Sequence, residues 1–219
     1  MVQTIPASRV NIRTLIDNFG LELVRDEHLF PEWQTVLPPV TIPEQQQLDR
    51  IINGFNNLLE YPPLLEDIIR MAVVDPLLFL CGFYLPPFYV RYCSATLKRS
   101  EYSVEIGDVE EGILIKGSLD AIVLQDQFWV LIVESKQATY SVEAGRAQIL
   151  SYMLASPQPI TYGLVTNGGS FMFIKLVKNS HPQYATSKLF GIFNPDDLLS
   201  VFSILRYLGE LAKQNNIRI

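Results

Sequence analysis

A chain of 219 residues, 48% of them hydrophobic, can bury one substantial core, and its scattered Pro and Gly residues exclude a largely disordered protein. Its net charge of −6 and pI of about 5.0 count against a surface that is basic throughout, which is what usually grips nucleic acid. No apolar run is long enough to cross a bilayer, and two cysteines make no disulfide framework, so we expect a soluble cytoplasmic protein.

The first third of the chain has a helical pattern. Hydrophobic residues recur at helical spacing over 44–61, and Pro43 suits the first turn of that helix. The preceding segment, 30–43, is rich in proline and aromatic residues and is predicted to be an extended strap. A second helix is predicted from Pro62 onward, with a break at Pro76, because proline removes a backbone donor inside a helix.

From about residue 86 the pattern becomes that of strands, with many Tyr, Val and Thr residues. Strands are predicted over 88–97, 102–106, 112–124, 128–136, 161–166 and 171–177. Helices are predicted over 142–155 and 198–214. This order is typical of an α/β (α+β) protein whose sheet is flanked by helices. We expect a helical N-terminal extension over residues 1–61, packed on a core over residues 62–219.

The strand predicted at 128–136 ends in two charges. Six consecutive apolar residues, 128–133, indicate a strand buried on both faces, and Glu134 and Lys136 follow them. Because side chains alternate along a strand, both charges lie on one face. Charges at the end of a buried strand are unfavourable unless they are paired or used. A structural ion pair is the simplest alternative to a catalytic role.

The preceding strand supplies a third charge, Asp120. A three-residue turn at 125–127 would join the two strands as an antiparallel hairpin and place Asp120 opposite Ile132. Directly opposed residues share a face, and Glu134 and Lys136 lie on the same face as Ile132. Asp120 would then be a diagonal neighbour of Glu134, about 7–8 Å away at the backbone.

Two carboxylates and a lysine in this arrangement suit phosphodiester hydrolysis. Mg²⁺ prefers a few carboxylate oxygens and keeps several waters. It lowers the pKa of a bound water and neutralises charge on the phosphoryl oxygens. A neighbouring lysine can orient the attacking water or stabilise the developing negative charge. The residues therefore predict a Mg²⁺ site, for which Mn²⁺ is a chemically similar substitute.

Three further residues complete an ordered pattern. Glu66 lies on the helix before the strands, and Gln148 and Tyr152 share one face of the helix after them. Each alone is more simply explained as helix surface or packing. Together the motifs resemble those of RecB-like PD-(D/E)xK nucleases, and more closely the nuclease domain of type I restriction enzyme R subunits and their solitary bacterial relatives. The residues that carry the resemblance are Glu66, Gly117–Asp120, Glu134–Lys136 and Gln148–Tyr152, with the phrases FPEW, LDRI, GFYLPPF, WVLIVESK and YGLVTNGGSFMFIKLVK.

The resemblance covers the chain from about Phe19 to its end and implies a restriction-endonuclease-like fold. It implies a Mg²⁺-dependent endodeoxyribonuclease that serves restriction or another DNA-processing system. Asp120, Glu134 and the carbonyl of Ser135 would be metal ligands. Glu66 would complete the acidic cluster through a water.

The resemblance also assigns roles around the metal site. Lys136 would be the catalytic lysine, and Gln148 and Tyr152 would organise the site or contact the DNA backbone. Leu119 stands where the family motif has proline, a common departure. The sequence has no GxxxxGK[ST] motif and no room for a translocase, so we do not expect a complete R subunit. DNA is the expected partner, motor or specificity subunits would be separate chains, and a homodimer is an open alternative to a single chain.

Positive charge is concentrated in one part of the chain. No Asp or Glu occurs over 144–195, which contains Arg146, Lys175, Lys178 and Lys188. This segment carries +4 and leaves −10 for the rest of the chain, whose total is −6. These four cations are candidates for phosphate contacts. A β-rich, apolar stretch that carries few carboxylates is an equally good explanation.

Other candidate sites have less support. His28 and His181 have no Cys or Ser context for nucleophilic catalysis, and the acidic positions at 101–111 lack the spacing of an EF-hand. The aromatic residues of 83–92 could stack on bases, but core packing explains them better. The rival to a nuclease is a catalytically silent DNA- or protein-binding module on the same fold, which the acidic pI favours.

Overall fold

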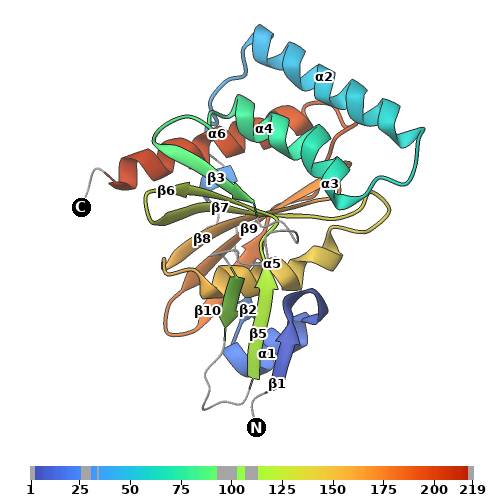
Figure 1. The fold of residues 1–219 in the computed structure, drawn as a ribbon. Coiled ribbons are helices and arrows are strands. Elements are labelled where there is room, and N and C mark those ends of the chain that lie inside the picture. Colours follow the sequence, from blue (N-terminus) through green and yellow to red (C-terminus); the bar gives the residue numbers. More distant parts are fainter. Residues whose placement is uncertain (1–2, 26–30, 34, 93–102, 107–112, 217–219) are drawn as a thin grey trace.

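The computed structural model describes residues 3–25, 31–33, 35–92, 103–106 and 113–216 (Figure 1). The C-terminal part of the strand predicted at 88–97 lies outside these residues. So do the acidic positions at 101–111, except for Glu105, of which only the backbone is described. Within the described residues, no helix is both long enough and apolar enough to cross a bilayer.

Helices lie on both sides of a central sheet (Figure 1). The helices are α1 (Ile12–Phe19), α2 (Ile42–Leu59), α3 (Glu66–Ile69), α4 (Asp75–Leu80), α5 (Glu143–Ala155) and α6 (Asp197–Asn216), together with η1 (Ala7–Arg9), η3 (Pro31–Trp33) and the π-helical η4 (Arg70–Val74). The strands are β1 (Gln3–Pro6), β2 (Glu22–Leu23), β3 (Phe88–Tyr92), β4 (Ser103–Ile106), β5 (Ile113–Ser118), β6 (Ala121–Gln125), β7 (Phe128–Ser135), β8 (Ile160–Thr166), β9 (Ser170–Lys178), β10 (Pro182–Thr186) and β11 (Phe190–Gly191). The helices α2, α4 and α6 cover one face of the sheet, and α1 and α5 lie on the other.

The larger of two sheets has eight strands, in the order β2-β10-β9-β8-β7-β6-β3 with β11 paired to β9. It is mixed, because β7 runs parallel to β8 and β10 runs parallel to β2, while its other neighbours are antiparallel. A parallel pair needs a crossover connection, which α5 supplies between β7 and β8. The smaller sheet, β1-β5-β4, contacts α5. The prediction of a mixed α/β protein with a sheet flanked by helices is confirmed.

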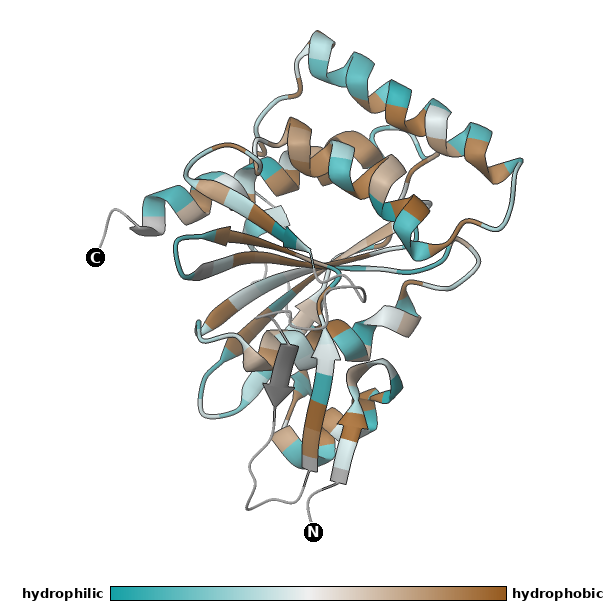
Figure 2. Cartoon of the chain, viewed as in Figure 1, coloured by the Kyte–Doolittle hydropathy of each residue, from teal (hydrophilic) through white to brown (hydrophobic). Residues whose placement is uncertain are grey.

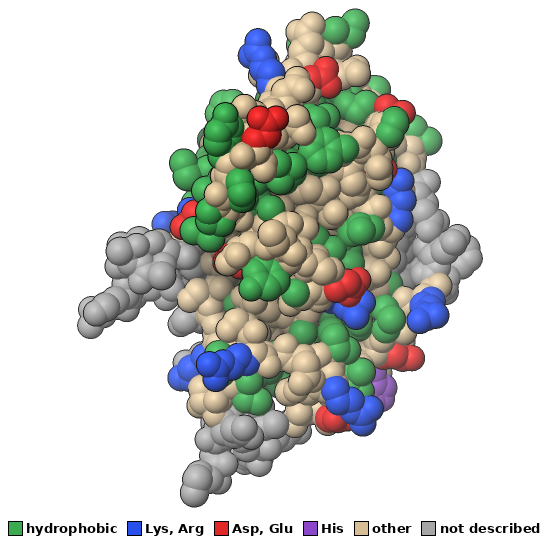
Figure 3. Space-filling model, turned by 90° about the vertical axis from the view of Figure 1, so that its right-hand side faces the viewer, with side chains coloured by type: hydrophobic (Ala, Val, Ile, Leu, Met, Phe, Trp, Pro, Cys, Tyr) green, Lys and Arg blue, Asp and Glu red, His purple; other side chains and the backbone are tan. Residues whose placement is uncertain are grey.

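Side chains alternate across the central strands and build a core on each face. Ala121, Val123 and Val133 pack into the cluster that includes α2, α4 and α6. Ile122 and Ile132 pack into the cluster of α1 and α5. The apolar central strands stand out in Figure 2, and Figure 3 shows further hydrophobic side chains exposed over the helical layer that contains α2 and α4. β7 is therefore buried on both faces, as its apolar run predicts.

The second predicted helix differs from expectation. It begins at Glu66 and continues through the π-helical segment Arg70–Val74 into α4, with no break at Pro76. The N–H of Asp75 bonds to the carbonyl of Arg70, five residues back. A proline is incompatible with a regular α-helical turn because it lacks an N–H and its ring meets the carbonyl four residues back. The π turn just before Pro76 accommodates it.

The β6–β7 hairpin departs from its predicted register twice. Its turn has two residues, 126–127, rather than three, so that Gln125 pairs with Phe128. A bulge then shifts the pairing by one further residue between Val123 and Leu124. Either change alone would turn the side chains of β7 to the opposite face, whereas the two together restore the predicted face.

The combined shift matters for the acidic residues. Ala121 pairs with Val133, so the next position, Asp120, comes opposite Glu134 rather than opposite Ile132. The predicted diagonal relation is therefore wrong, and the predicted shared face is right. The two carboxylates are brought closer than the sequence suggested, because directly opposed residues are nearer than diagonal ones.

The first 61 residues are not purely helical. β1 pairs with β5 and β2 pairs with β10, both in parallel, so this segment adds an edge strand to each sheet. Part of the predicted strap forms η3, in which Glu32 is buried. The strands β10 and β11 were also not predicted, and each pairs with β9.

Candidate active site

Asp120 lies at the corner where the chain passes from the smaller sheet into the larger one. β5 ends at Ser118, Leu119 is fully buried, and β6 begins at Ala121. The Asp120 carboxylate accepts a hydrogen bond of 2.6 Å from the N–H of Ser135, at the end of β7. This bond ties the corner to the end of the neighbouring strand.

Glu134 and Lys136 lie at that same strand end. Glu134 is 1% exposed, and Nζ of Lys136 donates to its Oε1 at 2.6 Å. Nζ also donates to Oε1 of Gln148 at 3.0 Å. The backbone N–H of Lys136 bonds to the carbonyl of Thr166 on β8, which fixes the base of the side chain. An ammonium group has three donors, so these two acceptors leave one for a further oxygen.

α5 connects the lysine to the Asp120 corner through side chains. Nε2 of Gln148 donates to Oη of Tyr152 at 3.0 Å, and that hydroxyl donates to the carbonyl of Ser118 at 2.8 Å. The chain of hydrogen bonds therefore runs from Lys136 to the strand end just before Asp120. Gln148 and Tyr152 are brought to the site on one helical face, as their spacing predicts.

Two glycines allow the elements of the site to approach this closely. A Cβ at Gly145 would lie 2.7 Å from Cγ1 of Val165 and 3.1 Å from Cε of Lys136. A Cβ at Gly117 would lie 2.7 Å from Oη of Tyr152. A side chain at either position would push α5 or its tyrosine away from the strand ends.

Burial and surplus negative charge shift protonation at the site. Burial raises the pKa of Glu134 to about 8, Asp120 adds to the rise, and Lys136 opposes it. Burial likewise raises the pKa of Asp120 to about 6, which the N–H of Ser135 opposes and Glu66 reinforces. Burial alone would lower the pKa of Lys136, but the neighbouring carboxylates outweigh it and raise the pKa. A further cation would relieve the repulsion between the carboxylates.

The side chains fit a divalent cation. Oε2 of Glu134 is buried and has no hydrogen-bond partner among the described residues, an unfavourable state that a bound cation would remove. Glu66 lies on the open side, with its side chain 48% exposed and its Oε1 4.0 Å from Nζ of Lys136. No cluster of three or more His, Cys, Asp or Glu side chains able to hold a metal occurs in the described part of the chain. Mg²⁺ needs only one or two carboxylates, because it keeps several of its waters.

Two of the four cations considered for phosphate contacts are occupied by the fold. Lys175 is 7% exposed, and its Nζ lies 2.5 Å from Oε1 of Glu32, so it is not available to a phosphate in this conformation. Nζ of Lys178 donates to the carbonyls of Leu154 and Ser156 at the end of α5. The prediction that Lys175 contacts a phosphate is therefore wrong for this conformation, because its charge neutralises the buried carboxylate of Glu32.

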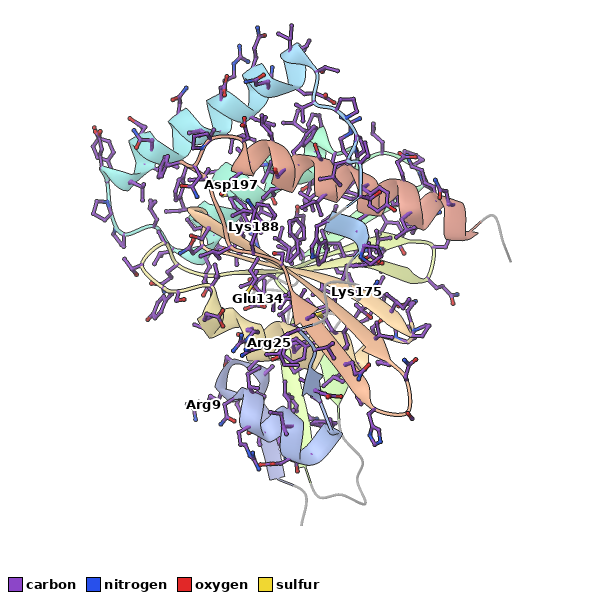
Figure 4. The ribbon with its side chains drawn as sticks, turned by 180° about the vertical axis from the view of Figure 1, so that it is seen from behind. Arg9, Arg25, Glu134, Lys175, Lys188 and Asp197 are labelled. Carbon is purple, nitrogen blue, oxygen red and sulfur yellow. The ribbon has the colours of Figure 1, made fainter. Side chains whose placement is uncertain are left out.

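The other two cations do not form a continuous basic surface either. Lys188 pairs with Asp197 at 2.9 Å, and Arg146 pairs with Glu143 at 3.0 Å on α5. Figure 4 shows Lys188 and Asp197 together near α6, away from the strand end that carries Glu134. Tyr152, the remaining candidate for a DNA contact, is 1% exposed and organises the site from within.

Arg70 is a residue of this region that the sequence analysis missed. It follows Glu66 by about one helical turn, and its charge opposes the rise that burial causes in the pKa of Asp120. Its guanidinium carbon lies 5.1 Å from the centroid of the Tyr92 ring. The i, i+4 spacing from Glu66 is the signal that could have identified it.

No model of a known protein family matches this chain, and no curated protein is significantly similar to it. Function therefore has to be inferred from the site itself and from the pattern of motifs.

Proposed function

We propose that this protein is a Mg²⁺-dependent endodeoxyribonuclease of the PD-(D/E)xK type with a restriction-endonuclease-like fold. The observation that carries the proposal is the meeting of Asp120 and Glu134 at strand ends around a single lysine, Lys136. A structural ion pair needs one carboxylate for one lysine. One buried carboxylate, Glu134, and one half-buried carboxylate, Asp120, beside a single lysine leave surplus negative charge, which favours a bound cation.

The chain offers a set of oxygens for that cation. The carboxylates of Asp120 and Glu134 and the carbonyl of Ser135 would hold Mg²⁺. Glu66, half exposed at the open side, would act through a water. When bound, Mg²⁺ supplies a water of lowered pKa and neutralises charge on the phosphoryl oxygens.

Lys136 acts in this scheme as a cation rather than as a base. The surrounding carboxylates raise its pKa in spite of burial, so it keeps its proton at neutral pH. Two of its N–H groups are held by Glu134 and Gln148, and the third orients the attacking water or stabilises a phosphoryl oxygen. Hydrolysis forms a bond from the water oxygen to phosphorus, breaks the bond from phosphorus to the leaving oxygen, and delivers a water proton to that oxygen.

A second candidate is a binding module on the same fold without turnover. The observation that favours it is the ion pair of Glu134 and Lys136. The Glu134 carboxylate is only 1% exposed and already has a cationic partner in Lys136. The ordered set of Gln148, Tyr152 and Ser118 behind the lysine favours the enzyme, because a module that only binds has no need to orient an ammonium group.

The proposal extends to the setting of the activity. We assign the protein to restriction or another DNA-processing system, with separate motor or specificity subunits as partners, or with a second copy of the chain. These partners would supply DNA affinity that the acidic surface does not provide on its own.

The decisive experiment incubates the purified protein with linear, circular and single-stranded DNA in Mg²⁺, Mn²⁺ or EDTA. Cleavage of circular DNA that requires Mg²⁺ or Mn²⁺ is the expected result. Calorimetry would measure metal binding in parallel. Cleavage that EDTA leaves unchanged would refute the mechanism, and metal binding without cleavage of any DNA form would favour the silent module.

A further inference from the structure

An open groove runs between α2 and α4. It has a volume of about 740 Å³, within the range of sites that hold small molecules or parts of larger ligands. Its lining is mainly apolar and aromatic, with Met71, Phe79 and Tyr84 among the residues. It carries one cation, Arg50, and one carboxylate, Asp75, which accepts a hydrogen bond from Tyr92. None of these lining residues is used by the site described above.

The apolar side chains of this groove are unusually exposed. Met71 is 68% exposed, Phe79 is 66% exposed and Tyr84 is 39% exposed. Leu85, just beyond Tyr84, is 63% exposed. The rings of Phe79 and Tyr84 lie 6.2 Å apart and are tilted by 51°, so they present neighbouring aromatic surfaces. Their neighbours Phe83 and Phe88 are buried, which divides the aromatic segment 83–92 into core residues and surface residues.

A chain of contacts leads from the groove to Arg70, which lies on the side of the acidic site. The hydroxyl of Tyr84 hydrogen-bonds to that of Tyr92, which in turn donates to Asp75 at 2.8 Å. The ring of Tyr92 carries the guanidinium of Arg70 at 5.1 Å, and Arg70 lies close enough to Asp120 to affect its protonation. The contacts thus lead from the aromatic surface to Arg70, and the charge of Arg70 acts on Asp120.

Arg70 does not line the groove itself, but it directly precedes the lining residue Met71 and is available to a ligand that extends beyond the groove. Its side chain is 25% exposed, and its one salt-bridge partner among the described residues is Asp67, whose side chain is 80% exposed and lies 3.2 Å away. Such a surface pair is weak and easily exchanged for a phosphate. The stack on Tyr92 holds the guanidinium plane in place without using its donors.

We propose that the groove between α2 and α4 binds a single-stranded segment of the DNA substrate, with bases on Phe79 and Tyr84 and phosphates on Arg50 and Arg70. The inference rests on the proposed nuclease function and gives its substrate class: DNA with an unpaired tail next to the cleaved bond. Aromatic rings interleaved with cations are what single strands need, because bases stack and phosphates pair with positive charge. A paired duplex hides its base faces and would leave the exposed rings unused.

The test measures binding separately from cleavage. Fluorescence anisotropy in EDTA compares a labelled oligothymidine, a blunt duplex and the same duplex with a single-stranded tail. The variants are Phe79→Ala and Arg50→Gln, with Leu189→Ala as the matched control because Leu189 is 56% exposed on a different part of the chain. Phe79 and Arg50 are both exposed, so the variants should fold, which circular dichroism would check.

We expect Phe79→Ala to weaken binding of the oligothymidine and the tailed duplex at least about fivefold, and to leave the blunt duplex unchanged. Arg50→Gln should lower the salt slope for the tailed duplex by about one unit. Leu189→Ala should do neither. Equal losses on the blunt duplex, or no loss on the tail, would overturn the inference.

Two other outcomes separate this inference from its premises. If Phe79→Ala dissociates a dimer in sedimentation velocity and leaves DNA affinity unchanged, a second copy occupies the groove and the inference fails. If the wild-type protein cleaves no DNA but Phe79→Ala still weakens binding of the tail, the proposed nuclease function fails and the groove inference stands.

Discussion

Two buried carboxylate–lysine pairs lie in this molecule and look alike at first sight. Glu134 and Lys136 are 2.6 Å apart at the end of β7, and Glu32 and Lys175 are 2.5 Å apart where η3 packs on β9. The two carboxylate residues are 1% and 6% exposed, respectively. Each also keeps one carboxylate oxygen without a hydrogen-bond partner among the described residues, so that feature does not separate them.

The balance of charge separates them. Oε1 of Glu32 accepts bonds from one ammonium, that of Lys175, and from one neutral hydroxyl, that of Tyr162 at 2.7 Å. Lys136 instead faces Glu134, Asp120 and Glu66, which together raise its pKa. A pair that neutralises itself needs no ligand, whereas a lysine outnumbered by carboxylates leaves a site for a cation. Residue type and distance alone would not have distinguished the two.

The largest expected effect comes from removing Lys136 or one of the two carboxylates, Asp120 and Glu134, that lie beside it. Asp120→Ala, Glu134→Ala and Lys136→Ala should each lower metal-dependent cleavage at least about 10³-fold, because each removes a ligand or the orienting cation. The double variant Asp120→Ala/Glu134→Ala should be hardly slower than either single change, since the residues act as a unit. Initial rates on circular DNA would measure this.

The control for these variants is Asp17→Asn, which changes an exposed carboxylate paired with Arg13 and should keep the wild-type rate. Asp120→Asn and Glu134→Gln preserve shape and should retain or increase stability, because they relieve repulsion between neighbouring carboxylates. A Lys136 variant that cleaved at the wild-type rate would exclude the lysine from the mechanism.

Breaking the Glu32–Lys175 pair should instead lower the stability of the fold. Lys175→Met leaves Glu32 buried without its cation and is expected to lower the free energy of unfolding by about 3–5 kcal/mol. Urea denaturation would measure the loss. The cleavage rate per folded molecule should not change, because this pair lies outside the site.

The double change Glu32→Gln/Lys175→Met should recover most of the lost stability, since no buried charge remains. Lys136→Met should be less destabilising than Lys175→Met, because Glu134, whose pKa burial raises to about 8, can take up a proton in place of its partner. Equal losses for the two lysines would show that the pairs are not different in kind.

A smaller effect is expected from pH. Burial raises the pKa of Glu134 to about 8 and that of Asp120 to about 6, so the folded, metal-free protein holds protons that the unfolded chain releases. Stability is then highest below the ordinary carboxyl pKa and falls as pH rises through about 6 and then about 8. Urea midpoints in EDTA on either side of this range would measure the fall.

Two comparisons sharpen the pH prediction. Glu134→Gln should flatten the upper part of the profile, because the titrating group is gone. Saturating Mg²⁺ should oppose the fall, because a bound cation replaces the protons. A metal-free protein that became more stable over this range would contradict the proposed protonation.

The local features of the site could be predicted from sequence, and its long-range features could not. Alternation along β7 placed Glu134 and Lys136 on one face, and helical spacing placed Gln148 and Tyr152 together. The face of Asp120 came out right although the turn length was wrong, because the unforeseen bulge cancelled the error. A bulge depends on packing from outside the hairpin, which no local pattern contains.

The missed elements share a physical cause. β1 and β2 are short edge strands whose partners, β5 and β10, lie more than half the chain away. The Glu32–Lys175 pair joins residues 143 positions apart, so each charge taken alone looked free for another use. By contrast, the helix through Pro76 was missed for a local reason, because a proline in a helical pattern predicts a break and the π turn that accommodates it leaves no sequence signal.

The smallest expected effect concerns the cations of the basic segment, and it tests whether a lysine used by the fold can also bind DNA. Nζ of Lys178 bonds to the carbonyls of Leu154 and Ser156, and Nζ of Lys188 bonds to Asp197. Each cation that contacts a phosphate contributes about one unit to the slope of log affinity against log salt. Lys178→Gln and Lys188→Gln should leave that slope unchanged for a tailed duplex. Lys178 is held by backbone carbonyls, and Lys188 is held by Asp197, whose side chain is 10% exposed, whereas Asp67, the partner of Arg70, is 80% exposed.

Stability provides the matching readout. Lys178→Gln removes donors from the last carbonyls of α5 and should lower the free energy of unfolding by about 1 kcal/mol. Lys188→Gln removes only a surface ion pair and should lower the free energy of unfolding by less, since such pairs contribute about 0–1 kcal/mol. A slope that dropped by a full unit in either variant would show that the protein exchanges these internal partners for phosphates. The conclusion that Lys178 and Lys188 stabilise the fold and do not bind DNA would then be wrong.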